Sequence, residues 1–129
     1  MKRSGIINGQ LASLLARFRH VNSIAIVDGP FPTYPNIETV DLAVTKGFPT
    51  IPQILDQILP LLDISGLYLA TEFEISVDSK IVADYKSHLG GVSPTLITHE
   101  EFKRRVGQTL GIIHTGDPIP YSSVILTSG

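Results

Sequence analysis

Hydrophobic positions along the chain change their spacing from segment to segment, which predicts alternating helices and strands. In GQLASLLARF, residues 9–18, the apolar side chains fall on one helical face, and Asn8 stands where an N-cap residue would. Ser23–Val27 is almost continuously apolar, as expected for a strand covered on both faces. Residues 29–35 contain three prolines and are predicted to form a loop.

The rest of the chain continues the alternation. Further strands are predicted at Thr39–Thr45, Gly66–Ala70, Thr95–Thr98, Leu110–His114 and Ser123–Thr127, and further helices at Thr50–Leu62, Val77–Leu89 and His99–Val106. This order predicts one α/β domain over residues 1–129, a three-layer sandwich with a central, largely parallel sheet flanked by helices. A short, turn-rich segment joins the last two strands, which suggests an antiparallel edge.

Composition removes several classes of function. Ten basic and 12 acidic residues give a net charge of −2 without a basic block, so we expect no nucleic-acid partner. The absence of cysteine excludes disulfides, thiolate metal sites and a cysteine nucleophile. The N-terminus lacks the apolar stretch of a signal peptide, and no apolar run approaches the roughly 18 residues of a membrane span. We therefore expect a cytoplasmic protein that does not contact membranes.

Common cofactor and catalytic motifs are also missing. The chain has neither GxGxxG nor the phosphate-binding GxxxxGK[ST], and neither GxSxG nor HExxH occurs. The four histidines are scattered, without metal-ligand spacing. We expect no cofactor and no metal.

Polar residues gather instead where the predicted strands end. In an α/β sheet, binding groups collect beyond the carboxyl ends of the strands. The residues at these ends are Asp28, Glu72, Glu74, His99, Glu100, Lys103, Thr115, Gly116, Asp117, Tyr121, Ser122 and Ser123. This set suits a small polyhydroxylated ligand held by side-chain hydrogen bonds.

Each prominent residue also has a purely structural explanation. Asp28 could simply initiate the loop, and His99 could stand in for a helix N-cap. Tyr121 could be a buried tyrosine with a satisfied hydroxyl, and His20 a surface residue near a helix C-terminus. Spacing alone does not choose between these explanations and a ligand site.

An ordered set of short motifs adds to this picture. The set comprises Gly5–Asn8, His20, Asp28, VDLAVTKGFP at 40–49, THEEFK at 98–103, HTGD at 114–117 and Pro120–Tyr121. It resembles the D-ribose pyranase family, which also includes the L-fucose mutarotases. The resemblance implies a three-layer α/β fold, a short strand at Gly5–Asn8, and cofactor-independent interconversion of the pyranose and furanose forms of free ribose.

The resemblance also implies roles for individual residues. His20 would be the catalytic acid/base, and the sugar would be lined by Asp28, His99, Lys103, Tyr121 and Ser123. His20 and Asp28 would then form opposite walls of one sugar site. The chain would form a homo-oligomer, pentameric rings stacked as a decamer, with the sugar in clefts between adjacent subunits. The alternatives are an L-fucose-type mutarotase and a non-catalytic monosaccharide-binding protein.

The chain departs from the family pattern at several positions. Arg19 stands where the family has glycine, and Gly29-Pro30 replaces Ala-Gly. His114 replaces the arginine of an Arg-Thr-Gly-Glu run, and Glu72-Phe73-Glu74 replaces an acidic–Ile–Lys run. Ser123 replaces an asparagine and lacks the amide donors of that side chain. These substitutions lie at or beside the expected site.

Overall fold

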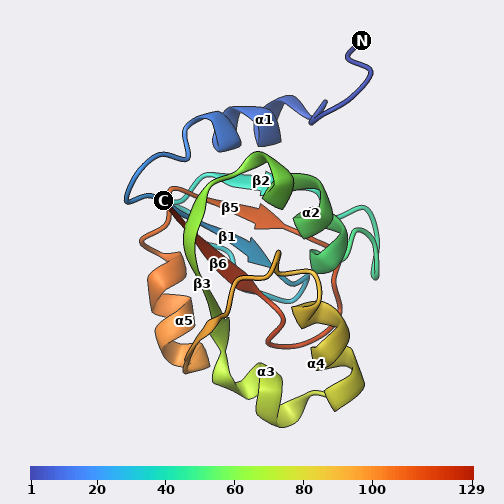
Figure 1. Cartoon of the computed structure of the whole chain (residues 1–129), viewed down its shortest axis with the longest axis vertical. Helices are drawn as coiled ribbons and strands as arrows, with labels where there is room; N and C mark the ends of the chain where they lie inside the picture. Colours follow the sequence, from blue (N-terminus) through green and yellow to red (C-terminus); the bar gives the residue numbers. More distant parts are fainter.

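Apolar strands form the centre of a six-stranded mixed sheet (Figure 1). The computed structural model describes residues 1–129. The strands are β1 (Ser23–Val27), β2 (Thr39–Asp41), β3 (Ile64–Ala70), β4 (Thr95–Ile97), β5 (Gly111–His114) and β6 (Val124–Ser128). Their spatial order is β2-β5-β1-β6-β3-β4. The predicted α/β fold class and the predicted strands are confirmed, although β2 is shorter than expected and β3 begins earlier.

The last strand lies elsewhere than predicted. β6 is antiparallel, but it lies between β1 and β3 in the interior of the sheet, and β5 pairs with β1 and β2. The expectation of an antiparallel edge made by the closing pair is therefore wrong. Val124, Ile125 and Leu126 are all buried, and β6 pairs with a neighbouring strand along each of its two edges, which makes it an interior strand. The remaining pairings, β1 with β5, β2 with β5 and β3 with β4, are parallel.

Two hydrophobic cores fill the space between sheet and helices. Along β1, Ile24 and Ile26 face the larger core, while Ala25 and Val27 face the smaller one. The larger core packs under α1 (Gly9–Ala16), α2 (Ile51–Ile58), α3 (Thr71–Ser76) and α4 (Ser79–Lys86), and the smaller core packs under α5 (His99–Val106). Figure 1 shows α5 set apart from the other helices, as a three-layer arrangement requires.

The helix boundaries follow from capping groups. The predicted Asn8 cap is confirmed, since its side chain accepts a bond from Leu11 N–H. Thr50 and Gln53 form a capping box at α2, which ends at Ile58 and continues as the 3₁₀ turn η1 (Leu59–Leu61). The residues of Gly5–Asn8 form no strand, contrary to the resemblance, and α3 is a helix that the sequence pattern did not predict. None of the helices has the length and apolar character needed to cross a bilayer.

The segment after β2 is fastened to the segment after β5 through Gly116. Gly47 N–H donates to the Gly116 carbonyl at 2.7 Å, and Gly116 N–H donates to the Pro49 carbonyl at 2.9 Å. A Cβ atom at residue 116 would lie 2.2 Å from the Thr45 oxygen and 2.5 Å from the Phe48 oxygen. Because both neighbours are backbone, only glycine permits this approach, and the two segments that carry family-like motifs interlock here.

We predict that Gly116→Ala lowers the free energy of unfolding by about 3 kcal/mol, because a backbone shift must relieve the clash. The matched control is Gly9→Ala at the start of α1, where a Cβ meets nothing within 4 Å. That change is expected to be neutral or to stabilise by about 0.5–1 kcal/mol. Urea unfolding of both variants measures the difference, and equal stabilities would contradict the steric argument.

Candidate functional site

Asp28 is a buried carboxylate directly beyond the end of β1. It is 4% exposed, and its partner Ser123 is 2% exposed. The Ser123 hydroxyl donates to Asp28 Oδ2 at 2.9 Å and accepts the Asp28 backbone N–H at 2.9 Å. Burial raises the pKa of Asp28, and the nearby Asp117 charge adds to the effect, while the Ser123 bond opposes it. Ser123 thus supports Asp28, and the hydroxyl proton of Ser123 is already used in this hydrogen bond.

The backbone on both sides of Asp28 is held by residues that follow β5. The Val27 carbonyl accepts from both the N–H and the hydroxyl of Thr115, at 3.1 and 2.8 Å. Gly29 N–H donates to the Asp117 carbonyl at 2.8 Å, and the Gly29 carbonyl lies 3.0 Å from His114 Nε2. Asp28 is therefore fixed by its neighbours as well as by its own side chain.

His99 begins α5 and faces an aromatic cluster. Its ring makes edge contacts with Tyr121 at 4.9 Å and Phe31 at 5.9 Å between centroids. Its backbone N–H donates to both carboxylate oxygens of Glu72, at 3.0 and 3.1 Å. Burial and the positive charge of Lys103 lower the pKa of His99, which favours the neutral ring. A neutral imidazole offers one donor and one acceptor to a ligand.

Lys103 lies one turn further along α5. Its ammonium pairs with Glu100 at 2.7 Å, and this contact raises the pKa of Lys103. Its carbonyl accepts the Tyr34 hydroxyl at 2.7 Å. Tyr121 lies in the turn before β6 and has a left-handed backbone conformation, with φ of 61°. Its ring packs against His99. Asp28, His99, Lys103, Tyr121 and Ser123 thus gather at one end of the sheet, with donors and acceptors suited to sugar hydroxyls.

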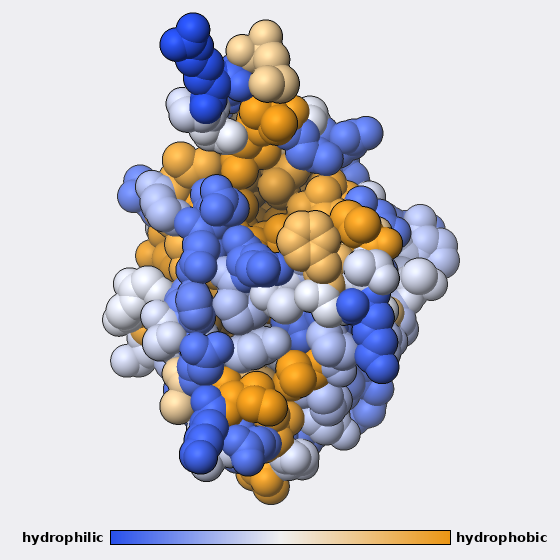
Figure 2. All heavy atoms as spheres, turned by 90° about the vertical axis from the view of Figure 1, so that its right-hand side faces the viewer, coloured by the Kyte–Doolittle hydropathy of each residue, from blue (hydrophilic) through white to orange (hydrophobic).

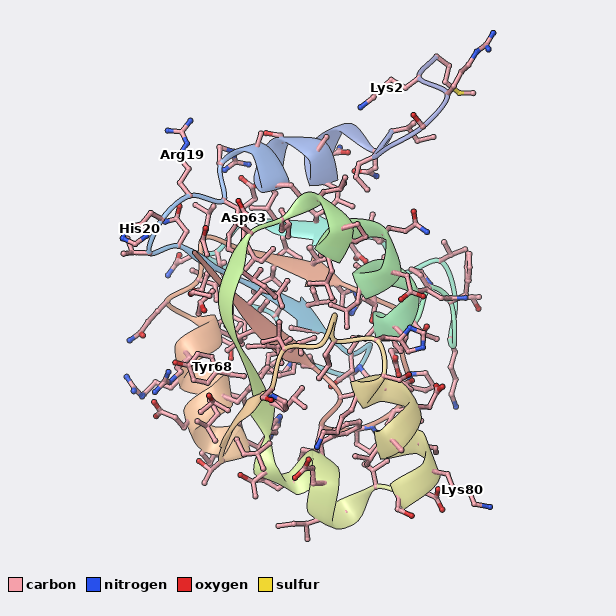
Figure 3. The ribbon with its side chains drawn as sticks, viewed as in Figure 1. Lys2, Arg19, His20, Asp63, Tyr68 and Lys80 are labelled. Atoms are coloured by element: carbon pink, nitrogen blue, oxygen red, sulfur yellow. The ribbon has the colours of Figure 1, made fainter.

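His20 does not join this group within one chain. It is exposed and precedes β1, whereas Asp28 follows β1, so the strand separates the two residues by about 16 Å or more. Figure 3 shows His20 and Arg19 projecting outward, away from the sheet. The turn is closed by Asn22, which bonds Arg19 through backbone and side chain at 2.9 Å each. The expectation that His20 and Asp28 form opposite walls of one site fails for a single subunit.

Two acidic residues that the sequence analysis counted among the strand-end ligand groups, Asp117 and Glu72, have structural partners instead. Asp117 is fully buried and accepts from Ile51 N–H at 2.9 Å, Ile119 N–H at 2.9 Å and the Tyr85 hydroxyl at 2.8 Å. Glu72 anchors the start of α5, as described above. Their positions after strands were visible in the sequence, but their partners come from elements distant along the chain.

The other residues at the strand ends have structural partners. Glu74 pairs with Lys86 of α4, and Ser122 donates to the Ile119 carbonyl. No three histidine, aspartate or glutamate side chains converge in a way that could hold a metal ion. The groups around Asp28 are hydrogen-bonding side chains such as Ser123 and titratable side chains such as His99.

Comparison with known proteins shows the family to which this chain belongs. The model of the RbsD / FucU transport protein family matches residues 1–129. The chain is 35% identical to the D-ribose pyranase of Geobacillus kaustophilus, covering 100% of this chain and 94% of that protein. It is 36% identical to the D-ribose pyranase of Clostridium botulinum, covering 100% and 98%.

Solved structures agree with the sequence relatives. Bacillus subtilis RbsD complexed with D-ribose superposes with a TM-score of 0.90 at 26% identity, covering 100% of this chain and 98% of that one. The fucose mutarotase of Streptococcus pneumoniae in complex with L-fucose gives 0.76 at 24% identity, covering 95% and 93%, and shows the shared fold. The α/β fold with a polar cluster beyond the strand ends is thus that of the sugar-ring isomerases. The chain belongs to the RbsD / FucU family.

We predict that Ser123→Ala raises the pKa of Asp28 further, because it removes a hydrogen bond to the charged form. It should also cost about 1–3 kcal/mol of stability near neutral pH, since a buried carboxylate and N–H lose their partner. Carboxyl carbon NMR of Asp28 against pH gives the first quantity, and urea unfolding the second. Ser122→Ala, equally buried but bonded to Ile119, is the control and should leave the Asp28 titration in place.

Proposed function

We propose that this protein is a D-ribose pyranase, an isomerase that interconverts the β-pyranose and β-furanose forms of free D-ribose without a cofactor. The observation that carries the proposal is the full-length identity of up to 36% to D-ribose pyranases. The polar cluster at the carboxyl end of the sheet fits this activity, because its groups can bind several hydroxyls of one small sugar. A ribose-complexed structural neighbour supports the same ligand.

The proposed reaction needs only proton transfers. A cyclic sugar is a hemiacetal, and its ring opens when a base removes the anomeric hydroxyl proton while an acid protonates the ring oxygen. The open-chain aldehyde then reacts with a different hydroxyl, which closes the furanose ring. An imidazole can accept a proton on one ring nitrogen and donate one from the other, so His20 suits both steps. Asp28, His99, Lys103 and Tyr121 would hold the hydroxyls that do not react.

The separation of His20 from Asp28 supports a site shared between subunits. One chain carries the acid/base group at the start of β1 and the binding cluster beyond its end. A complete site then requires His20 of one copy beside the Asp28 cluster of another. We propose a closed ring of subunits, as pentamers stacked into a decamer, in which every neighbouring pair forms such a site.

The surface fits an assembly of this kind. Val21, next to His20, is 82% exposed and adopts a φ of 65°, which is unusual for a β-branched residue. Ile7, Val44 and Phe48 are also exposed. Figure 2 shows a broad apolar area on the side of the molecule below the N-terminal tail. Exposed apolar areas of this kind are typical of protein contacts. We further propose a cytoplasmic location, where free ribose is available before its phosphorylation.

A non-catalytic monosaccharide-binding protein is the alternative that one feature favours. Ser123 donates its hydroxyl proton to Asp28, so it has fewer hydrogen-bond donors for the sugar than the asparagine of the family. The two functions differ in whether ring exchange is accelerated, because binding alone moves no proton.

We predict that the protein accelerates exchange between the anomeric proton signals of D-ribose, measured by saturation-transfer NMR. L-Fucose should exchange more slowly under the same conditions, because the full-length relatives at 35% and 36% identity are D-ribose pyranases. Faster exchange of fucose would assign the mutarotase branch. Ribose binding without faster exchange would leave the binding protein as the function.

We predict that His20→Ala lowers the catalysed exchange by about 10²–10⁴-fold while ribose still binds. Asp28→Asn should also be inactive. Co-expression of the two variants in equal amounts should restore about a quarter of native activity, because a complete site needs intact His20 from one subunit and intact Asp28 from its neighbour.

The control pairs each single variant with a chain that carries both changes. These mixtures have no combination of intact halves and should stay inactive. Lack of restoration in the His20→Ala and Asp28→Asn mixture, with both variants shown to assemble together, would place the site within one chain.

A further inference from the structure

The imidazole of His114 bridges two oxygen acceptors. Its Nδ1 lies 2.8 Å from Asp41 Oδ1 on β2, and its Nε2 lies 3.0 Å from the Gly29 carbonyl oxygen. A carboxylate and a carbonyl cannot donate protons in these contacts. Both contacts are therefore hydrogen bonds only when both ring nitrogens carry a proton, which makes the ring an imidazolium cation.

The surroundings of His114 favour this charge. Asp41 lies beside the ring on β2, and the Asp28 carboxylate adds a negative field from beyond β1. Two further charged residues line the same hollow of about 420 Å³ as His114, and their charges are opposite. They are Lys46, from the segment after β2, and Asp117, from the segment after β5. Burial opposes the charge, but the Gly29 carbonyl and Asp41 outweigh it and raise the pKa of His114. The pKa of Asp41 is lowered in return by the His114 contact.

Gly29 is the residue directly after Asp28, and both of its backbone groups are bonded. Its N–H donates to Asp117, whose carbonyl does not titrate, and its carbonyl accepts from His114. The His114 bond is thus the one contact in this clamp that depends on pH. Family members carry arginine at this position by the resemblance drawn above, and arginine keeps its charge at all working pH values.

We propose that the His114 imidazolium is a positioning residue that fixes the Gly29 carbonyl and thereby the Asp28 carboxylate for sugar binding. The Asp28 backbone lies between two clamped neighbours, Val27 and Gly29. When His114 loses a proton, one of its nitrogens presents a lone pair to an acceptor, and that contact becomes repulsive. The remaining N–H stays with the charged Asp41, because hydrogen bonds to ionised acceptors are stronger. The Gly29 carbonyl is released.

The direction of the pH effect follows from the raised pKa. The His114 bonds are complete at pH values below the folded-state pKa and are lost as the pH rises through it. Ribose affinity should therefore weaken on the alkaline side, seen as a rise in KM of about tenfold with a smaller change in kcat. Replacement by arginine should remove this alkaline rise, and replacement by leucine, which has no donor for the Gly29 carbonyl, should give the weakened state already at neutral pH.

The test compares native protein with His114→Arg and His114→Leu in two measurements. The first is the pH profile of KM for ribose exchange, which rests on the proposed function. The second is independent of it: NMR follows the His114 ring carbons and the Gly29 amide against pH. We expect a single shared midpoint above the ordinary value near 6.5 for histidine, and no such transition of the Gly29 amide in His114→Arg.

His88→Leu is the matched control, because His88 Nδ1 also pairs with a carboxylate, Asp56, at 2.7 Å, on the surface between α2 and α4. This variant should keep the native profile. A Gly29 amide that ignores the His114 titration, or an alkaline KM rise that persists in His114→Arg, overturns the proposal. If ribose is not turned over, the proposed function fails while the NMR arm still decides the role of His114.

Discussion

The burial of one carboxylate, Asp28, is the constraint on which the site depends. A buried charge is tolerated only when its oxygens and its surrounding backbone are bonded. Ser123 supplies the side-chain partner, and the segment after β5 supplies the backbone partners. Both come from strands adjacent to β1 in the sheet, so the strand order itself brings them to Asp28. The interior position of β6 is therefore a condition for the site, because β6 places Ser123 beside the end of β1.

The sequence predicted the elements better than their arrangement. Nearly continuous apolar runs identified β1, β3 and β5, and Asn8 identified the start of α1, because these signals are local. The predicted position of β6 was wrong because a short connection between strands suggests a hairpin, whereas β6 pairs with β1 and β3, which are distant along the chain. The helix α3 was missed because six residues, Thr71–Ser76, contain too few turns to show an apolar face.

The candidate site was predictable in its location but less so in its roles. The rule that binding groups collect beyond the carboxyl ends of strands pointed to Asp28, His99 and Tyr121. The structure brings these residues together at one end of the sheet. That rule says nothing of partners, so the anchoring of His99 by Glu72 and the burial of Asp117 could not be inferred. His20 came from family resemblance alone, because it is an exposed residue before β1 and lies apart from the Asp28 cluster within one chain.

The departures from the family pattern shift the support of Asp28 towards shorter side chains. Serine at 123 reaches only Asp28, while a longer asparagine could also extend towards a ligand. Histidine at 114 makes two bonds to fixed acceptors, whereas an arginine has five donors and a longer reach. Under the proposed function, both changes would leave fewer donors near the sugar on this side of the site. Recognition of the ligand would then depend more on the side formed by His99, Lys103 and Tyr121, whose aromatic packing and ion pair to Glu100 hold these residues in place.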